Sequence, residues 1–196
     1  MAIDPIALIK TLGLVGVMII VFAETGLFFG FFLPGDSLLF SAGLLAAAGF
    51  ISFWPLLVGV IVAAIIGDSV GYWFGRKVGY RIFFKEDSFF FNKKYIDKTK
   101  LFFEKYGSKT IIFARFVPIV RTFAPILAGV GGMNYKTFLR FNILGGFLWP
   151  IILVPAGYFL GNKIPNIDQY ILPVAGIIIL LSFLPFLTTL FKRKKT

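Results

Sequence analysis

The sequence predicts an all-α, polytopic membrane protein, built from inverted repeats with two re-entrant hairpins plus spanning helices. Of its 196 residues, 58% are hydrophobic, which is more apolar surface than a soluble domain of this length can hide. Several apolar runs are long enough to enter or cross a bilayer core of roughly 30 Å. Two of these runs contain proline, glycine and charge, and part of the chain repeats. We expect one membrane domain covering residues 1–196.

Long apolar segments alternate with breaks along the whole chain. The first runs over residues 8–33, is interrupted at Pro34-Gly35-Asp36, and is followed by a second apolar stretch at 37–50. Segments that read as spanning helices follow further along, at residues 54–74, 137–161 and 169–191. Each of these three is long enough to cross a bilayer as a helix.

Positive charge is concentrated outside the apolar segments. The net charge of +11 comes mainly from residues 76–109 and from Lys192-Arg193-Lys194-Lys195. Both clusters flank apolar segments, which places them and the C-terminus in the cytoplasm under the positive-inside rule. Residues 92–106 read as a basic amphipathic helix that Gly107 ends and that lies in the headgroup layer; a solvated linker helix is the alternative. Because the charge is not spread over a polar face, we expect no nucleic-acid partner.

An internal repeat appears at an offset of 86 residues. Residues 42–77 and 128–163 share nine identities in 36 positions, including Ala42-Gly43 with Ala128-Gly129 and Gly71-Tyr72 with Gly157-Tyr158. The spanning helix of the first copy runs toward the cytoplasm at Arg76, whereas the matching helix of the second starts near Lys136 and Arg140 and should run outward. The copies are therefore expected to be inverted. We assign repeat one to about 12–77, a basic cytoplasmic segment to 78–109, repeat two to about 110–163, and a C-terminal spanning helix to 169–191. Inverted repeats with interrupted helices are typical of transporters.

Residues 20–50 and 110–133 share an unusual design. Each is apolar, each contains proline and glycine near its middle, and each carries charge. Broken backbone at membrane depth is tolerated only where it is buried in protein or lines a wet cavity. We therefore predict that both segments are re-entrant hairpins. An ordinary kinked spanning helix is the alternative in each case.

Four charges in these hairpins are the candidate binding residues. Glu24 and Asp36 belong to the first hairpin, and Arg115 and Arg121 to the second. A charge at the centre of the bilayer costs roughly 3 kcal/mol on insertion scales. We therefore expect all four side chains to face inward, where they are paired or solvated. Two structural ion pairs that pin hairpin to hairpin are the alternative, and a pair that opens for a ligand would serve both roles.

Asp68 is a fifth candidate, placed in a spanning helix beside Gly67, Gly71 and Gly75. The four-residue spacing of those glycines favours close helix packing. Asp68 itself is interpreted as a proton site, an arginine partner or a structural residue.

Two absences narrow the chemistry. The chain has no cysteine and no histidine, which excludes disulfides, histidine-based zinc sites, Ser-His triads and phosphohistidine intermediates. We expect no metal, no cofactor and no enzymatic activity. A membrane enzyme acting on lipid phosphates is the least favoured reading.

Several motifs together resemble the DedA family, also called the VTT or SNARE-associated domain. The residues that carry the resemblance are Glu24 with Phe32-Leu33-Pro34-Gly35-Asp36, the segment Gly67 to Arg76, the hairpin Arg115-x-x-Pro118-x-x-Arg121, and then Ala128-Gly129, Met133, Phe138, Asn142 and Trp149. The resemblance implies a bacterial inner-membrane protein with two opposed re-entrant hairpins, functional residues at Glu24, Asp36, Arg115 and Arg121, and dependence on the proton-motive force. It also implies transport of undecaprenyl phosphate or phosphatidylethanolamine, or phospholipid scrambling. Asp36 is a mild departure, since glutamate is also common there.

The predicted function is therefore transport of a phosphate-headed lipid, most simply undecaprenyl phosphate, across the bacterial plasma membrane with proton coupling. The expected partners are membrane lipids and protons, and the sequence leaves room for a homo-oligomer. A phosphatidylethanolamine or general phospholipid flippase or scramblase is the first alternative. A proton-coupled antiporter for small solutes or cations, which would bind them at the buried acids, is the second.

Overall fold

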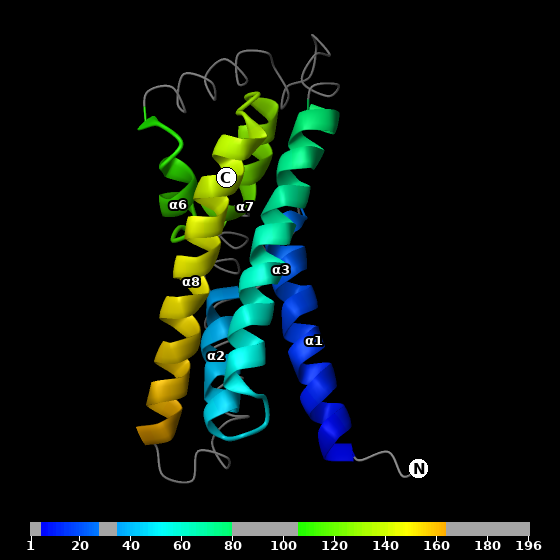
Figure 1. Cartoon of the computed structure of the whole chain (residues 1–196), viewed down its shortest axis with the longest axis vertical. Coiled ribbons are helices and arrows are strands. Elements are labelled where there is room, and N and C mark those ends of the chain that lie inside the picture. The colour runs from blue at the N-terminus through cyan, green and yellow to red at the C-terminus, as the bar shows by residue number, and fades with distance from the viewer. Residues whose placement is uncertain (1–4, 28–34, 80–105, 164–196) are drawn as a thin grey trace, which may run out of the picture. The chain divides into compact units, whose positions relative to one another are not determined.

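The computed structural model describes residues 5–27, 35–79 and 106–163, and within these ranges every regular element is a helix (Figure 1). The elements are α1 (Pro5–Gly26), α2 (Gly35–Ala47), α3 (Phe53–Phe74), the π-helical turn η2 (Gly75–Gly79), α6 (Thr110–Ala114), α7 (Pro118–Val130) and α8 (Tyr135–Lys163). The predicted all-α class is confirmed. The amphipathic helix predicted at 92–106, apart from Tyr106, and the spanning helix predicted at 169–191 lie outside the described residues.

Two helices in the described part of the chain are long and apolar enough to cross a membrane. They cover Phe53–Val78 and Tyr135–Lys163, with 26 and 29 residues, and a rise of about 1.5 Å per residue makes both longer than a bilayer core of roughly 30 Å. By contrast, α2 and α7 have 13 residues each, or roughly 20 Å at the same rise. They are too short to cross alone, and their re-entrant course stays a prediction.

The break between α6 and α7 follows from Pro118. Proline at the first turn of a helix sacrifices no hydrogen bond, and it forces the residue before it into an extended conformation. Val117 has φ −116° and ψ 107°, and α7 starts directly after it. The chain therefore ends one helix at Ala114 and begins another at Pro118.

The turn between α7 and α8 uses glycine and asparagine. Gly132 has φ +73°, a conformation that side chains with a Cβ rarely adopt. The Met133 N–H donates to the Ala128 carbonyl at 3.0 Å, which closes the end of α7. Asn134 then caps α8, since its Oδ1 accepts from the Lys136 N–H at 2.9 Å. The predicted glycine-rich end of the second hairpin thus becomes a tight helix–helix turn.

The chain divides into two compact units. Unit 1 comprises Met1–Val21, Phe32–Ile61 and Pro150–Thr196, and unit 2 comprises Phe22–Phe31 and Val62–Trp149. Helices α1, α3 and α8 contribute residues to both units.

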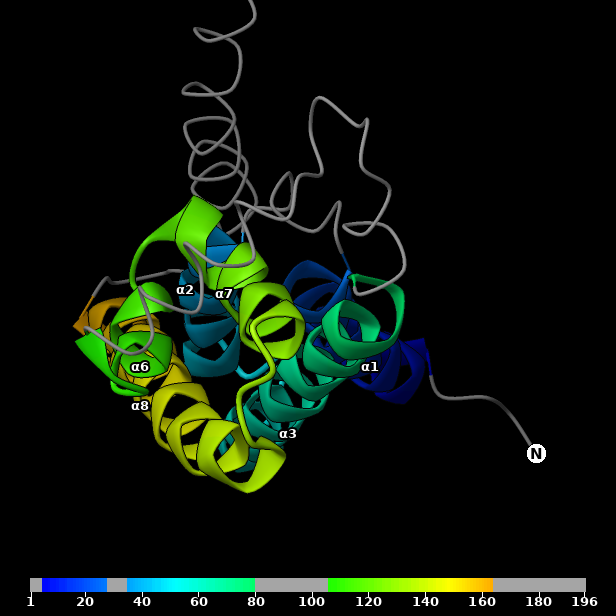
Figure 2. The ribbon, with the colours of Figure 1, turned by 90° about the horizontal axis from the view of Figure 1, so that it is seen from above.

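The same kind of glycine packing occurs within each unit. In unit 1, Gly43 of α2 lies against the backbone of Val154 and Tyr158 in α8. In unit 2, Gly129 of α7 lies against the backbone of Tyr72 in α3 and Arg76 in η2, so that α7 packs beside the end of α3 (Figure 2). A Cβ at either glycine would overlap main-chain atoms. Gly43 and Gly129 are equivalent in the predicted repeat, whose inverted relation stays a prediction.

The described helices expose apolar side chains and bury several charged ones among an apolar core. Along α3, Val58, Val62, Ile66 and Val70 are spaced four apart and are 40–56% exposed. The buried residues include five that are charged or strongly polar: Glu24, Asp68, Arg115, Arg121 and Asn142. A long exposed apolar stripe over a charged interior is expected where lipid, and not water, surrounds the helices.

Candidate functional site

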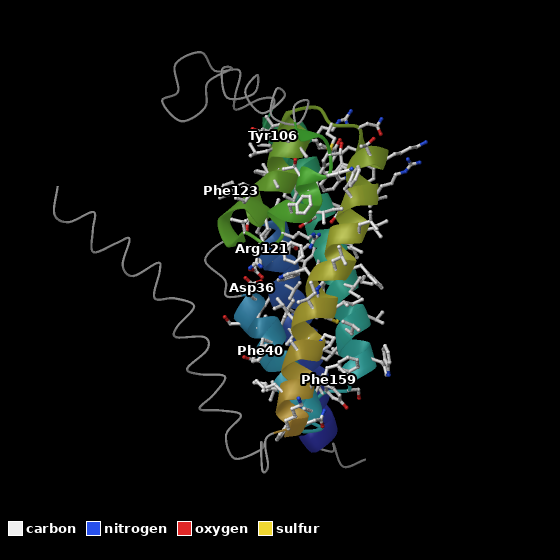
Figure 3. All side chains as sticks on the ribbon, turned by 90° about the vertical axis from the view of Figure 1, so that its left-hand side faces the viewer. Asp36, Phe40, Tyr106, Arg121, Phe123 and Phe159 are labelled. Atoms are coloured by element: carbon white, nitrogen blue, oxygen red, sulfur yellow. The ribbon has the colours of Figure 1, made fainter. Side chains whose placement is uncertain are left out.

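The described part of unit 2 holds two buried ion pairs, and the first joins Arg121 to Glu24. Arg121 lies in the first turn of α7, directly after the break at Pro118, and Figure 3 labels its side chain there. Its Nη2 donates to Oε1 of Glu24, near the end of α1, and the two side chains are 5% and 1% exposed. The structure thus brings together one predicted acid and one predicted arginine from two separate broken segments.

Trp149 of α8 completes the surroundings of Arg121. The guanidinium carbon lies 4.8 Å from the centre of the indole ring, within range of a cation–π interaction. Trp149 is itself only 1% exposed. Its ring face contacts a candidate binding group, a role that the sequence analysis did not assign to Trp149.

The second buried ion pair joins Arg115 to Asp68 of α3. Arg115 follows the last residue of α6, and its Nη2 donates to Oδ2 of Asp68 and to Oδ1 of Asn142 in α8, the latter at 2.5 Å. The Ala64 carbonyl lies 3.5 Å from the same nitrogen. The three polar side chains are at most 3% exposed. Of the roles that the sequence left open for Asp68, the structure provides that of arginine partner.

Asn142 is held in a single orientation by its other contacts. Its Nδ2 donates to the Ile65 carbonyl at 3.0 Å and to the Ser69 hydroxyl at 3.4 Å. Because the amide nitrogen is used in this way, the amide oxygen faces Arg115 as an acceptor. Sequence reasoning did not single out Asn142 as a site residue, although an asparagine inside an otherwise apolar spanning segment was an available signal.

Two adjacent glycines make room for the Arg115 side chain. A Cβ on Gly145 would lie 2.9 Å from the arginine Cδ, and a Cβ on Gly146 would lie 2.7 Å from Cγ1 of Ile65 and 3.4 Å from the arginine Nη2. The side chain therefore passes through a slot between α3 and α8 that exists because α8 carries no side chain at these two positions. Gly145 and Gly146 belong to the site in this sense.

A smaller network ties the end of α3 to the α7–α8 turn. The Tyr72 hydroxyl donates to the Met133 carbonyl and accepts from Nη1 of Arg76 at 2.8 Å. The Arg76 guanidinium lies 6.0 Å from the Trp73 ring, and the Tyr72 ring stacks on Phe138 with centroids 4.7 Å apart. These contacts fix the helix ends from which α7 and α8 depart.

Asp36 belongs to unit 1, whereas both ion pairs belong to unit 2. It occupies the first turn of α2, within unit 1, where it is half-buried and labelled in Figure 3. Its predicted role beside the arginines stays a prediction. Within the described residues no group of three or more metal-ligating side chains occurs.

Comparison of the sequence with known proteins assigns it to one family. The VTT domain family matches residues 33–159, which include α2, α3, both arginines and the α8 residues that contact them. The chain belongs to the DedA family of VTT-domain membrane proteins. This DedA-family chain is 47% identical over 170 residues to an uncharacterised membrane protein of Mycobacterium leprae, covering 87% of this chain and 76% of the relative. No solved structure matches.

Two Escherichia coli relatives extend the comparison. Protein DedA is 46% identical over 180 residues, covering 90% of this chain and 81% of that protein. Inner membrane protein YqjA is 36% identical over 152 residues, covering 78% and 69% respectively. The resemblance seen in the motifs is thus confirmed over most of the chain, and the protein is a bacterial membrane protein of the DedA family.

Proposed function

We propose that the protein transports a phosphate-headed lipid, with undecaprenyl phosphate as the leading candidate, and that the headgroup binds Arg121 in place of Glu24. The observation that carries this proposal is the buried pair between the two side chains, at the point where the second broken segment turns. Charged pairs at membrane depth are costly and usually mark the path of a substrate or ion.

The contact between Glu24 and Arg121 supports an anionic substrate, because a carboxylate and a phosphate bind a guanidinium in the same way. A carboxylate presents two oxygens to a guanidinium fork, and a phosphate presents the same arrangement with more charge. Glu24 therefore occupies the position of a headgroup in the resting state. A phosphate monoester, which carries about −1.5 to −2 charges near pH 7, competes for the same donors.

The surroundings support a lipid as the carrier of that phosphate. Helices of the same unit expose apolar side chains, such as Val120 on α7, Ile66 on α3 and Phe147 on α8. An isoprenoid or acyl tail is miscible with the lipid that such surfaces face. The tail can stay in the bilayer while only the headgroup moves through the protein.

Proton coupling follows from the exchange of partners. When the phosphate replaces Glu24 at Arg121, the displaced carboxylate loses its counter-charge in a buried place and favours the protonated form. Inward movement of an anion also opposes an inside-negative potential by roughly 2.3 kcal/mol per charge per 100 mV. A proton carried on Glu24 offsets both costs. Asp36 is proposed as a second proton-carrying acid, and the basic C-terminus as cytoplasmic.

Substitution of Arg121 by lysine tests the proposal. In proteoliposomes containing polyprenyl phosphate, Arg121→Lys should lower transport by at least about tenfold, since lysine keeps the charge but loses the fork and the stacking on Trp149. The matched control is Arg140→Lys on the exposed face of α8, which should stay within about twofold of wild type, as surface charges carry little energy.

The same vesicles distinguish the alternatives. Transport of phosphatidylethanolamine with no effect of a pH gradient would identify a phospholipid flippase or scramblase instead. Normal polyprenyl phosphate transport by Arg121→Lys would exclude Arg121 as the binding group.

A further inference from the structure

The two buried ion pairs differ in construction, and we propose that only one of them opens. Asp68 and Asn142 form a permanent latch on Arg115, called here the Arg115 latch, which holds the α6–α7 break in place throughout transport. Arg115 is then a positioning residue, and Arg121 alone exchanges its partner. This inference rests on the proposed function, because it assigns different roles to the two arginines in the same transport cycle.

The Arg115 latch joins three helices through one guanidinium nitrogen. Nη2 of Arg115 contacts a carboxylate and an amide oxygen at once, from two different helices. The amide is itself fixed by the Ile65 carbonyl at 3.0 Å. Opening the latch would leave a buried guanidinium, a buried carboxylate and a buried amide oxygen without partners together, and each unsatisfied buried group is costly.

The fit of the side chain points the same way. Arg115 occupies the space that Gly145 and Gly146 leave open, since a Cβ at Gly145 would meet its Cδ and Nε and a Cβ at Gly146 would lie 3.4 Å from its Nη2. An arginine that left this space during each cycle would not need two glycines to make room for its stem. The side chain instead anchors the residue that follows α6 to α3 and α8.

Arg121 is held by contacts that tolerate an exchange. The Trp149 ring attracts the guanidinium through its face, whatever anion lies at the guanidinium edge. The ring can keep the arginine in place while Glu24 gives way to phosphate. Such a support suits a binding group whose partner changes.

Helix α8 sets the distance between the two arginines. Asn142 and Trp149 are seven residues apart on this helix, so they lie on the same face; the first contacts Arg115 and the second contacts Arg121. With the Arg115 latch closed, the segment from 115 to 121 can place Arg121 only over Trp149. Arg115 thus acts on the headgroup through Arg121.

Matched replacements of each ion pair by apolar residues test this division. Arg115→Met and Asp68→Val alone should each lower polyprenyl phosphate transport by at least about tenfold, because each leaves one buried charge unpaired. The double variant Arg115→Met/Asp68→Val should return to within about threefold of wild type with an unchanged apparent affinity for the lipid, since an apolar pair can replace a buried ion pair and only the Asn142 amide oxygen then lacks its donor. The matched double variant Arg121→Met/Glu24→Leu should stay inactive.

The outcomes separate the two proposals. A thermally stable Arg115→Met/Asp68→Val protein that lacks transport, or binds the lipid more than tenfold more weakly, would show that Arg115 touches the headgroup and would overturn the latch. Wild-type transport by Arg121→Met/Glu24→Leu would instead overturn the proposed function. Rescue confined to the first double variant supports both.

Discussion

Replacing Glu24 by glutamine should weaken the fold and strengthen the binding of an anionic lipid. The change removes the charge that neutralises Arg121 while keeping the size of the side chain. Both side chains are almost fully buried, at 1% and 5% exposure, so solvent screens the remaining arginine charge little. Leaving one partner of a buried pair uncompensated costs about 3–5 kcal/mol.

That cost predicts a measurable loss of thermal stability. At about 2–4 °C per kcal/mol for a chain of this size, the melting temperature of Glu24→Gln in detergent should fall by roughly 6–20 °C. Polyprenyl phosphate should then stabilise the variant more than it stabilises the wild type, because the phosphate no longer competes with a carboxylate for Arg121. Tryptophan fluorescence during thermal unfolding, at a series of lipid concentrations, measures both effects.

Asp68→Asn is the matched control. This change also leaves a buried arginine without its carboxylate, so the melting temperature should fall by a similar amount. Polyprenyl phosphate should raise the melting temperature of Asp68→Asn no more than it raises that of the wild type, since Arg115 does not meet the headgroup. If polyprenyl phosphate stabilised Glu24→Gln no more than wild type, the idea that Glu24 occupies the headgroup position would be refuted.

Three further substitutions probe the framework of unit 2. Gly129→Leu should destabilise the protein by about 1–3 kcal/mol or more, because the new side chain meets main-chain atoms of α3. Gly16→Ala should not destabilise it, because a Cβ at Gly16 meets nothing within 4 Å. Equal melting temperatures in the two variants would contradict the packing of α7 on α3. Tyr72→Phe should lower the free energy of unfolding by about 1–3 kcal/mol, because it removes the hydroxyl that bonds α3 to the α7–α8 turn. An unchanged unfolding midpoint would show that this hydrogen bond does not stabilise the fold. Trp149→Phe should weaken lipid binding by about 0.5–2 kcal/mol through a poorer cation–π contact. Trp54→Phe, at a ring 71% exposed, serves as its control, and equal lipid affinities in the two variants would count against the stacking role.

Much of the fold could be predicted because the responsible signals are local. Apolar length fixed the two long helices to within a few residues, since a bilayer core sets the number of residues needed to cross it. Pro118 and the glycines after Val130 account for the ends of α7 within the predicted 110–133 hairpin, because proline and positive-φ glycine act on their immediate neighbours.

The pairing of the charges could not be predicted, because it depends on helix rotation and on contacts between distant segments. The sequence offered Glu24, Asp36, Asp68, Arg115 and Arg121 as a set, but no spacing rule says which acid faces which arginine. Asp68 meets Arg115 across 47 positions, and Glu24 meets Arg121 across 97. Asn142 and Trp149 lie on one face of α8, yet their significance appears only once the arginines are placed against that face.

The transport cycle must also balance the negative charge that the headgroup brings into the buried site. The four buried ions in the described part of unit 2, Glu24, Asp68, Arg115 and Arg121, sum to zero in the resting state. A phosphate monoester adds about −1.5 to −2 charges, and with Arg115 still paired the excess falls on Arg121 and Glu24. Protonation of Glu24 removes one charge of that excess, and the arginine then balances about half to two-thirds of the phosphate charge.

Glutamine at position 24 mimics the protonated acid permanently. Polyprenyl phosphate movement by Glu24→Gln proteoliposomes should therefore respond much less to an imposed pH gradient than the wild type, which should be accelerated by an inward proton gradient, and Asp36 should carry any response that remains. The comparison is a ratio of rates with and without the gradient, so a lower overall rate in the variant does not affect it. A variant that kept the full gradient response would place the coupling proton on another group, with Asp36 as the next acid to substitute.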